Sequence, residues 1–115
     1  MNKFLKGFQY AIEGILHCAR HERNFKIHLS ALVLVVIAGI WTGLSYVEWF
    51  IVIMLIGAVL ALEMINTAIE RTIDVITDEF HPLAKQAKDV AAGAVLIIAI
   101  ASAIIGLMIF LPKWF

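Results

Sequence analysis

Three long apolar segments constrain this chain more than any other feature. They cover roughly residues 29–44, 49–67 and 90–111, and Glu63 is the one charged side chain within them. A helix needs about 20 residues to cross the hydrocarbon core of a bilayer, because each residue advances it by only about 1.5 Å. Inside that core only helices and closed barrels satisfy every backbone polar group. The segments predict an all-α integral membrane protein with three transmembrane helices.

The composition agrees with this class. Of the 115 residues, 63% are hydrophobic, and the mean hydropathy of +0.95 lies outside the range of ordinary soluble domains. We expect a single membrane-embedded domain over residues 1–115. Nine basic and nine acidic side chains give no net charge, so the charge balance does not indicate nucleic-acid binding. The single cysteine, Cys18, excludes a disulfide within the chain.

Residues 3–20 have a different pattern, in which apolar and polar side chains separate on a helical wheel. The apolar side carries Phe4, Leu5, Phe8, Ala11, Ile12, Ile15, Leu16 and Ala19. Such a segment predicts an amphipathic helix that lies in the membrane interface. A helix docked on the protein's own bundle is the alternative, and the sequence leaves both open.

The lysines and arginines predict the orientation of the chain. Five of them precede the first span and three lie between the second and third spans, whereas the turn at residues 45–48 has none. By the positive-inside rule, the N-terminus and the second connection are cytoplasmic and the C-terminus is outside. Trp41, Tyr46 and Trp49 suit an aromatic belt on the outer side. We expect a multi-pass protein of the plasma membrane.

The stretch ALEMINTAIERTID, residues 61–74, places acids where the second span approaches the cytoplasm. On a helical wheel with Glu63 at the origin, Asn66, Glu70 and Asp74 fall at about −60°, −20° and +20°. The four side chains therefore share one face. Measured from Trp49 along the helix, Glu63 lies at about 21 Å and Glu70 at about 31 Å. Glu63 is thus expected within the hydrocarbon core.

An acid at that depth is costly. Insertion of an acidic side chain at mid-helix costs about 2.5–3.5 kcal/mol, so an intramembrane acid is a functional candidate by default. The alternative for Glu63 is a protonated or hydrogen-bonded packing residue, with Asn66 as the partner. For Glu70 and Asp74 the alternative is a solvated face near Arg71.

Two further polar clusters are expected at the same cytoplasmic level: HERNFKIH at 21–28 and DEFHPLAKQAKD at 78–89, where Pro82 marks a helix start. Acids there suit Mg²⁺, which is often held by one or two carboxylates and by substrate phosphates. Lysines suit the phosphates, and a deeper acid suits a group that arrives from the lipid. This combination favours a lipid kinase, although the chain contains no G-x-x-x-x-G-K-[ST], G-x-G-x-x-G, H-R-D or D-F-G motif.

Three motifs together resemble the small prokaryotic diacylglycerol kinase family. They are E-x-N-F-K-I-H at 22–28, E-x-x-N-T-A-I-E-x-x-x-D at 63–74 and H-P-x-A-K-x-A-K-D-x-A-A-G-A-V at 81–95. Within the family, the chain looks closest to the branch from Gram-positive bacteria that acts as undecaprenol kinase. The resemblance covers nearly the whole chain. It implies a homotrimer with shared active sites and transfer of the γ-phosphoryl group of Mg-ATP to a lipid hydroxyl.

The resemblance also implies residue roles. Glu63 is the implied general base, and Glu22 and Glu70 are the implied Mg²⁺ ligands on the ATP side of the site. The implied nucleotide contacts are Tyr10, Glu79, His81, Lys88 and Asp89, with Asn66 and Asp74 supporting the site. Lys3 stands where some relatives have arginine. His28 and Lys85 differ from the diacylglycerol-specific branch and favour undecaprenol as the substrate.

The residue spacing is compatible with these roles. Glu63 and Glu70 are separated by about 10.5 Å along a helix, too far to share one ion, yet suitable for flanking a transferring phosphoryl group. Two alternatives stay open at this point. One is a diacylglycerol kinase of the same family, and the other is a non-enzymatic membrane oligomer whose acids face a central pathway.

Overall fold

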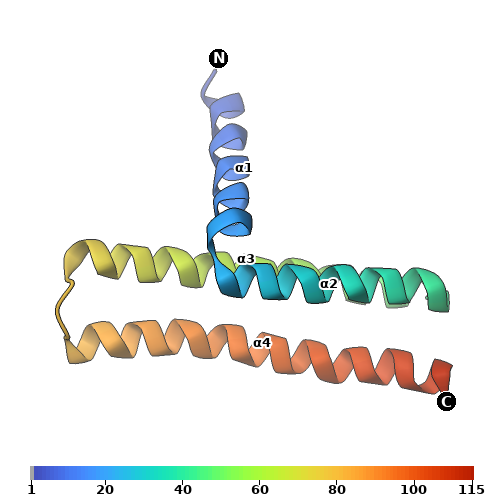
Figure 1. Cartoon of the computed structure of the whole chain (residues 1–115). Coiled ribbons are helices and arrows are strands. Elements are labelled where there is room, and N and C mark those ends of the chain that lie inside the picture. Colours follow the sequence, from blue (N-terminus) through green and yellow to red (C-terminus); the bar gives the residue numbers. More distant parts are fainter. Residues whose placement is uncertain (1) are drawn as a thin grey trace.

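The computed structural model describes residues 2–115, which form four helices (Figure 1). The helices are α1 (Lys3–His21), α2 (Arg23–Thr42), α3 (Tyr46–Ile76) and α4 (Pro82–Trp114). The last three are each long and apolar enough to cross a membrane. The predicted all-α class is confirmed, with three candidate membrane-spanning helices. Helix α1 is not one of the candidate spans.

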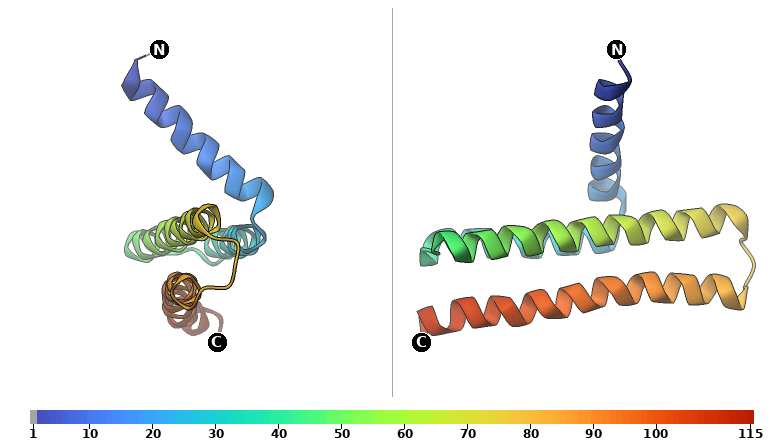
Figure 2. Two further views of the ribbon diagram at one scale, coloured as in Figure 1. Left: turned by 90° about the vertical axis from the view of Figure 1, so that its left-hand side faces the viewer. Right: turned by 180° about the vertical axis from the view of Figure 1, so that it is seen from behind.

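Helix α1 stands away from the other helices, as both views in Figure 2 show. Asn2 caps its start, where the side-chain Oδ1 accepts a hydrogen bond of 2.9 Å from the Leu5 N–H. Glu22 has extended backbone angles and separates α1 from α2. The break at this residue redirects the chain, so α1 contacts α2 and α3 while the large apolar side chains of its outer half, such as Phe4 and Phe8, stay exposed.

A tight turn joins α2 to α3. Gly43 ends α2 with φ at +82°, a conformation that glycine adopts without a steric penalty. The first predicted span runs to residue 44, two residues past the helix end at Thr42. Ser45 then caps α3 in a reciprocal arrangement with Glu48, in which each side chain accepts the other's backbone N–H, at 3.2 and 2.9 Å.

Helices α3 and α4 are longer than a bilayer requires. At 1.5 Å per residue, the 20 residues of α2 span about 30 Å, whereas the 31 of α3 and the 33 of α4 span about 46 and 50 Å. All three meet at the end that holds the α2–α3 turn and the C-terminus, so α3 and α4 extend past α2 at the opposite end (Figure 1). The sequence placed residues 70–89 in a connection, but α3 continues to Ile76 and α4 begins at Pro82.

The C-terminal end of α4 is fastened to the α2–α3 turn. Lys113 Nζ lies 3.1 Å from Glu48 Oε1, and the Trp114 indole N–H donates a 2.9 Å hydrogen bond to Thr42 Oγ1. The Trp41 and Trp114 rings meet edge to face at 6.5 Å between centroids. These contacts hold α4 antiparallel to α3. Most large apolar side chains of the three helices point outward and are exposed in the single chain, as a lipid environment requires.

Candidate active site

Glu63 is the most deeply buried acid of the described chain, with 3% of its surface exposed. It lies on the face of α3 that turns toward α2, where its Oε2 is 3.7 Å from Nε2 of His28. The two side chains come from different helices, so the contact depends on how α2 and α3 pack. A buried carboxyl group thus faces an imidazole across the α2–α3 interface.

Asn66, one turn further along α3, is also buried, at 4% exposure. Its side-chain amide N–H donates a hydrogen bond of 3.2 Å to Oε1 of Glu70. The amide oxygen of Asn66 is buried and has no hydrogen-bond partner within the described chain. Asn66 therefore positions Glu70 and keeps one acceptor free at the level between the two acids.

Arg71 joins the α1–α2 junction to the acid row of α3. Its guanidinium forms an ion pair with Glu22 and donates a hydrogen bond of 3.3 Å to His17 Nε2. The contact brings Glu22 to the turn of α3 that holds Glu70, and both carboxylates are close enough to Glu63 for their charges to act on it. Two of the predicted clusters therefore meet in one chain.

Cys18 lies in the last turn of α1, next to this junction, and its thiol is free and buried. Burial raises the pKa of the Cys18 thiol, and the negative charge of Glu22 raises it further. The thiol is consequently neutral near pH 7 and packs as a small apolar side chain.

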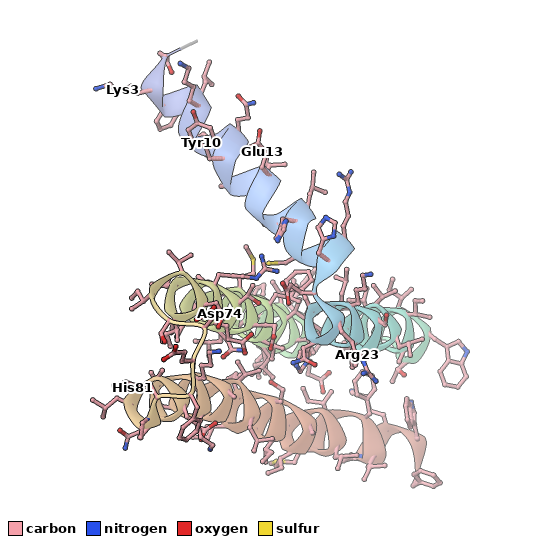
Figure 3. All side chains as sticks on the ribbon, turned by 60° about the vertical axis from the view of Figure 1, so that its left-hand side comes forward. Lys3, Tyr10, Glu13, Arg23, Asp74 and His81 are labelled. Atoms are coloured by element: carbon pink, nitrogen blue, oxygen red, sulfur yellow. The ribbon has the colours of Figure 1, made fainter. Side chains whose placement is uncertain are left out.

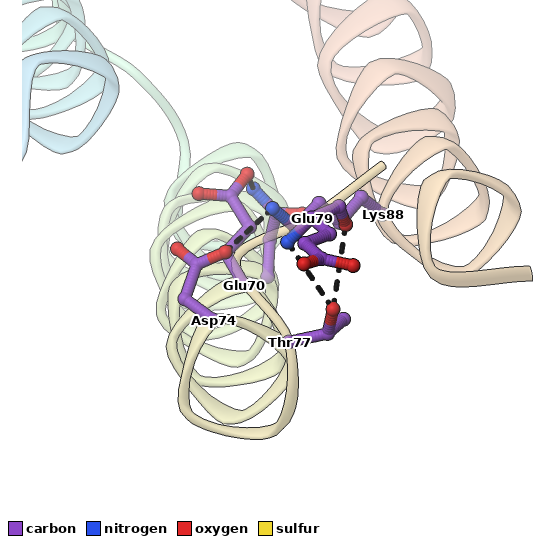
Figure 4. Close-up of polar contacts among 6 residues, drawn as sticks. Glu70, Asp74, Thr77, Glu79 and Lys88 are labelled. Atoms are coloured by element: carbon purple, nitrogen blue, oxygen red, sulfur yellow. Dashed lines mark hydrogen bonds and ion pairs between the residues drawn. The ribbon is translucent and has the colours of Figure 1, made fainter. Parts of the chain in front are cut away.

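The third predicted cluster forms a hollow of about 370 Å³ where α3 ends and α4 begins. Its polar lining comes from both helices and from the loop between them: Asp74, Thr77, Asp78, Glu79, His81, Lys85 and Lys88. Figure 4 shows the contacts at its base, where Lys88 Nζ lies 2.7 Å from Asp74 Oδ1. Thr77 holds the loop, because its hydroxyl accepts a 3.2 Å hydrogen bond from the Glu79 N–H.

His81 caps the start of α4 at the edge of this hollow. Its Nδ1 accepts a 3.1 Å hydrogen bond from the Leu83 N–H, so a neutral ring carries its proton on Nε2. Pro82 occupies the first helical turn, where a missing N–H costs nothing. The positive end of the α4 dipole, the Nε2–H of His81 and Lys88 all favour an anionic group in the hollow.

Two predicted nucleotide contacts lie elsewhere. Tyr10 is on the outer part of α1, 64% exposed, and Figure 3 shows it apart from Asp74 and His81. Asp89 is paired with Lys85, at 2.5 Å between Nζ and Oδ2, and does not line the hollow. Within one chain, Tyr10 therefore lies apart from the hollow, and Asp89 contacts it only through Lys85.

The structure also adds residues to which the sequence assigned no role. Arg71 is only a nearby positive charge in the sequence, His28 bears there only on the choice of lipid, and Thr77 has no assigned role. Each acts through a contact with a residue distant in sequence or through loop geometry. The one available signal was that Arg71 directly follows Glu70 on a polar helix face.

The donor chemistry of Glu22 and Glu70 fits Mg²⁺. Both offer carboxylate oxygens, the ligand type that Mg²⁺ prefers, and one or two carboxylates with substrate phosphates are a common set. The described residues contain no group of three or more side chains that by itself forms a metal site. An ion held here would therefore need phosphate oxygens to complete its coordination.

Comparison with known proteins identifies the family. The family model described as prokaryotic diacylglycerol kinase matches residues 9–110. An undecaprenol kinase from Bacillus subtilis is 55% identical over 113 residues, covering 98% of this chain and 92% of the relative. A diacylglycerol kinase from Synechocystis is 38% identical over 109 residues, covering 94% and 62%, and one from Escherichia coli is 29% identical over 102 residues, covering 89% and 84%.

The matched region contains the whole acid row, the α1–α2 junction and the hollow. The chain therefore belongs to the prokaryotic diacylglycerol kinase family and is a membrane lipid kinase.

Proposed function

We propose that this chain is an undecaprenol kinase that transfers the γ-phosphoryl group of Mg-ATP to the lipid hydroxyl. The observation that carries the mechanism is the position of Glu63, a buried acid beside a row of polar groups that leads to a nucleotide-sized hollow. The 55% identity to the Bacillus undecaprenol kinase, against 38% and 29% to two diacylglycerol kinases, supports undecaprenol as the acceptor.

Glu63 is the proposed general base. Its depth of about 21 Å from Trp49 matches a substrate whose hydroxyl lies just below the headgroups. The carboxylate accepts the proton of that hydroxyl as its oxygen attacks the γ-phosphorus, and the bond to the β-phosphate oxygen breaks with ADP as the leaving group. Asn66 holds Glu70 in place through its amide hydrogen bond.

The nucleotide occupies the hollow in this proposal. Lys88 and His81 donate to the phosphates, Asp74 orients Lys88 through their ion pair, and Glu79 contacts the nucleotide from the loop. Glu22 and Glu70 would hold Mg²⁺, and the bound ion would supply positive charge against the phosphates. The mixed acids and bases of the lining suit a metal–nucleotide complex better than a free anion.

We propose the same membrane arrangement that the charges favour. Helix α1 lies in the cytoplasmic interface of the plasma membrane, with its exposed apolar face toward the acyl chains. The N-terminus and the α3–α4 loop are then cytoplasmic, and Trp41 and Trp114 mark the outer interface. The extension of α3 and α4 past α2 is consistent with this, because it places the hollow in water.

A homotrimer with shared sites is also part of the proposal. Tyr10 and Asp89 lie outside the hollow of their own chain, and the Asn66 amide oxygen lacks an internal partner. Side chains from a second copy would complete the site at these positions. Cross-linking of the reconstituted protein, followed by mass measurement of the products, tests the number of copies.

Phosphorylation of the lipid by the purified full chain tests the function. Transfer of labelled phosphate from ATP to undecaprenol in a bilayer is expected, with a loss of at least about a hundredfold in Glu63→Gln. Undiminished activity in that variant removes Glu63 as the base. Diacylglycerol at equal mole fraction is the competing acceptor, and equal use of both lipids contradicts the undecaprenol assignment.

A further inference from the structure

His28 is the only basic side chain within ion-pair distance of Glu63 in the described chain. The other bases near the site are occupied, since Arg71 pairs with Glu22 and Lys88 with Asp74. The other charged side chains that act on Glu63 are both negative, namely Glu70 and Glu22. The buried carboxylate therefore has one candidate for its counter-charge.

The two side chains lie at matching depths. His28 is 14 residues before the end of α2 at Thr42, about 21 Å along the helix, and Glu63 is 17 residues after Tyr46, about 26 Å along α3. Both are thus inside the span from the turn, where a charge without a partner is strongly disfavoured. Two ionisable groups that face each other across a helix interface at this depth are arranged as partners.

The distance between them also matters. At 3.7 Å, Nε2 of His28 is beyond hydrogen-bond range of Glu63 Oε2 but within the range of an ion pair. The His28 imidazole therefore forms no hydrogen bond with the Glu63 carboxylate, whose lone pairs it leaves free. They stay available to accept a hydrogen bond from a substrate hydroxyl. The histidine side chain is 24% exposed, whereas that of Glu63 is buried, so the imidazole lies on the outer side of the pair.

We propose that His28 is the positioning residue of Glu63: the imidazole, when it carries both protons, holds the carboxylate toward α2 in the orientation that receives the lipid hydroxyl. This inference rests on the proposed role of Glu63 as the general base. His28 itself need not touch the substrate or the nucleotide. Its effect is therefore expected in the phosphoryl-transfer step and not in ATP binding.

Substitutions at residue 28 separate charge from shape. The full chain is reconstituted in a bilayer with undecaprenol and Mg-ATP. Its kcat and its KM for ATP are measured for the wild type and for the variants His28→Ala, His28→Gln and His28→Lys. We expect kcat to fall about tenfold or more in the Ala and Gln variants, with the KM for ATP changed by less than about twofold. The Lys variant restores a cation and is expected to recover at least about half of the lost activity.

A control on the same helix is Ser30→Ala, because Ser30 is exposed and its hydroxyl donates only to the Lys26 carbonyl within the described chain. It is expected to keep full kcat. Thermal unfolding in detergent is recorded for each variant, so that a kcat loss is assigned only where the fold is retained. The Gln and Lys variants resemble histidine in polarity, and they keep the comparison valid if the Ala variant unfolds.

Two results overturn the proposal. One is wild-type kcat in His28→Gln, which means that charge at this position is irrelevant, and the other is equal loss in the Gln and Lys variants. Failure of the general-base assignment is distinguishable from both, since it appears as retained activity in Glu63→Gln. Loss in Glu63→Gln with full activity in His28→Gln rejects only the role of His28.

Discussion

Arg71 of α3 forms an ion pair with Glu22, the residue that separates α1 from α2. The pair connects the proposed nucleotide-side acids to the point where α1 leaves the other three helices. It also means that a proposed Mg²⁺ ligand has a cationic partner within the chain. Arg71 and Mg²⁺ then compete for the same carboxylate.

Replacement of Arg71 by Gln is expected to ease this competition. An ion pair with this exposure contributes up to about 1 kcal/mol, so the half-saturating Mg²⁺ concentration falls by a factor of up to about five. Titration of kinase activity with Mg²⁺ at saturating ATP measures the effect. Arg20→Gln on exposed α1 is the control and leaves the titration unchanged. A higher Mg²⁺ requirement in Arg71→Gln contradicts the competition.

Lys88→Gln is expected to weaken ATP use. The side chain lines the hollow and is held by Asp74, so its loss removes a charged donor to the phosphates. The KM for ATP rises about tenfold, equivalent to about 1.4 kcal/mol, while the KM for the lipid stays the same. Lys26→Gln on α2, outside the hollow, is the matched control. An unchanged KM for ATP in Lys88→Gln excludes this lysine as a phosphate contact.

Gly39→Ala is expected to destabilise the α2–α3 hairpin. An added Cβ would lie 2.7 Å from the Trp49 ring, so the indole or the helix must move, at a cost of about 1–3 kcal/mol. The midpoint of thermal unfolding in detergent, followed by tryptophan fluorescence, measures the loss. Gly106→Ala is the control, because a Cβ there meets nothing within 4 Å. Equal midpoints for the two variants contradict the close approach.

Cys18 is expected to resist alkylation. Its raised pKa leaves less thiolate at a given pH than a free cysteine has, so iodoacetamide reacts slowly at pH 8 and faster after denaturation. Glu22→Gln removes a negative charge and accelerates the reaction. Since the folded thiol keeps its proton more tightly than the unfolded one, stability declines as pH rises above the ordinary pKa of cysteine. Equal alkylation rates in folded and denatured chains refute the burial.

Local features in the sequence determined the helical part of this protein. Apolar length predicted three spans because a bilayer penalises any unpaired backbone group, and the structure has three helices that are long and apolar enough to cross a membrane. Helical periodicity placed Glu63, Asn66 and Glu70 on one face because side-chain direction repeats every 3.6 residues. Pro82 marked the start of α4 for an equally local reason, whereas the first predicted span ran two residues past the end of α2 at Thr42.

Only the tertiary structure decided which charges face each other. His28 and Glu63 are 35 positions apart in the sequence, and Glu22 and Arg71 are 49 positions apart. Such pairs depend on the rotation and crossing of α2 and α3, which periodicity within one helix does not specify. The sequence identified the acids of the candidate site, and helix packing selected the bases that accompany them.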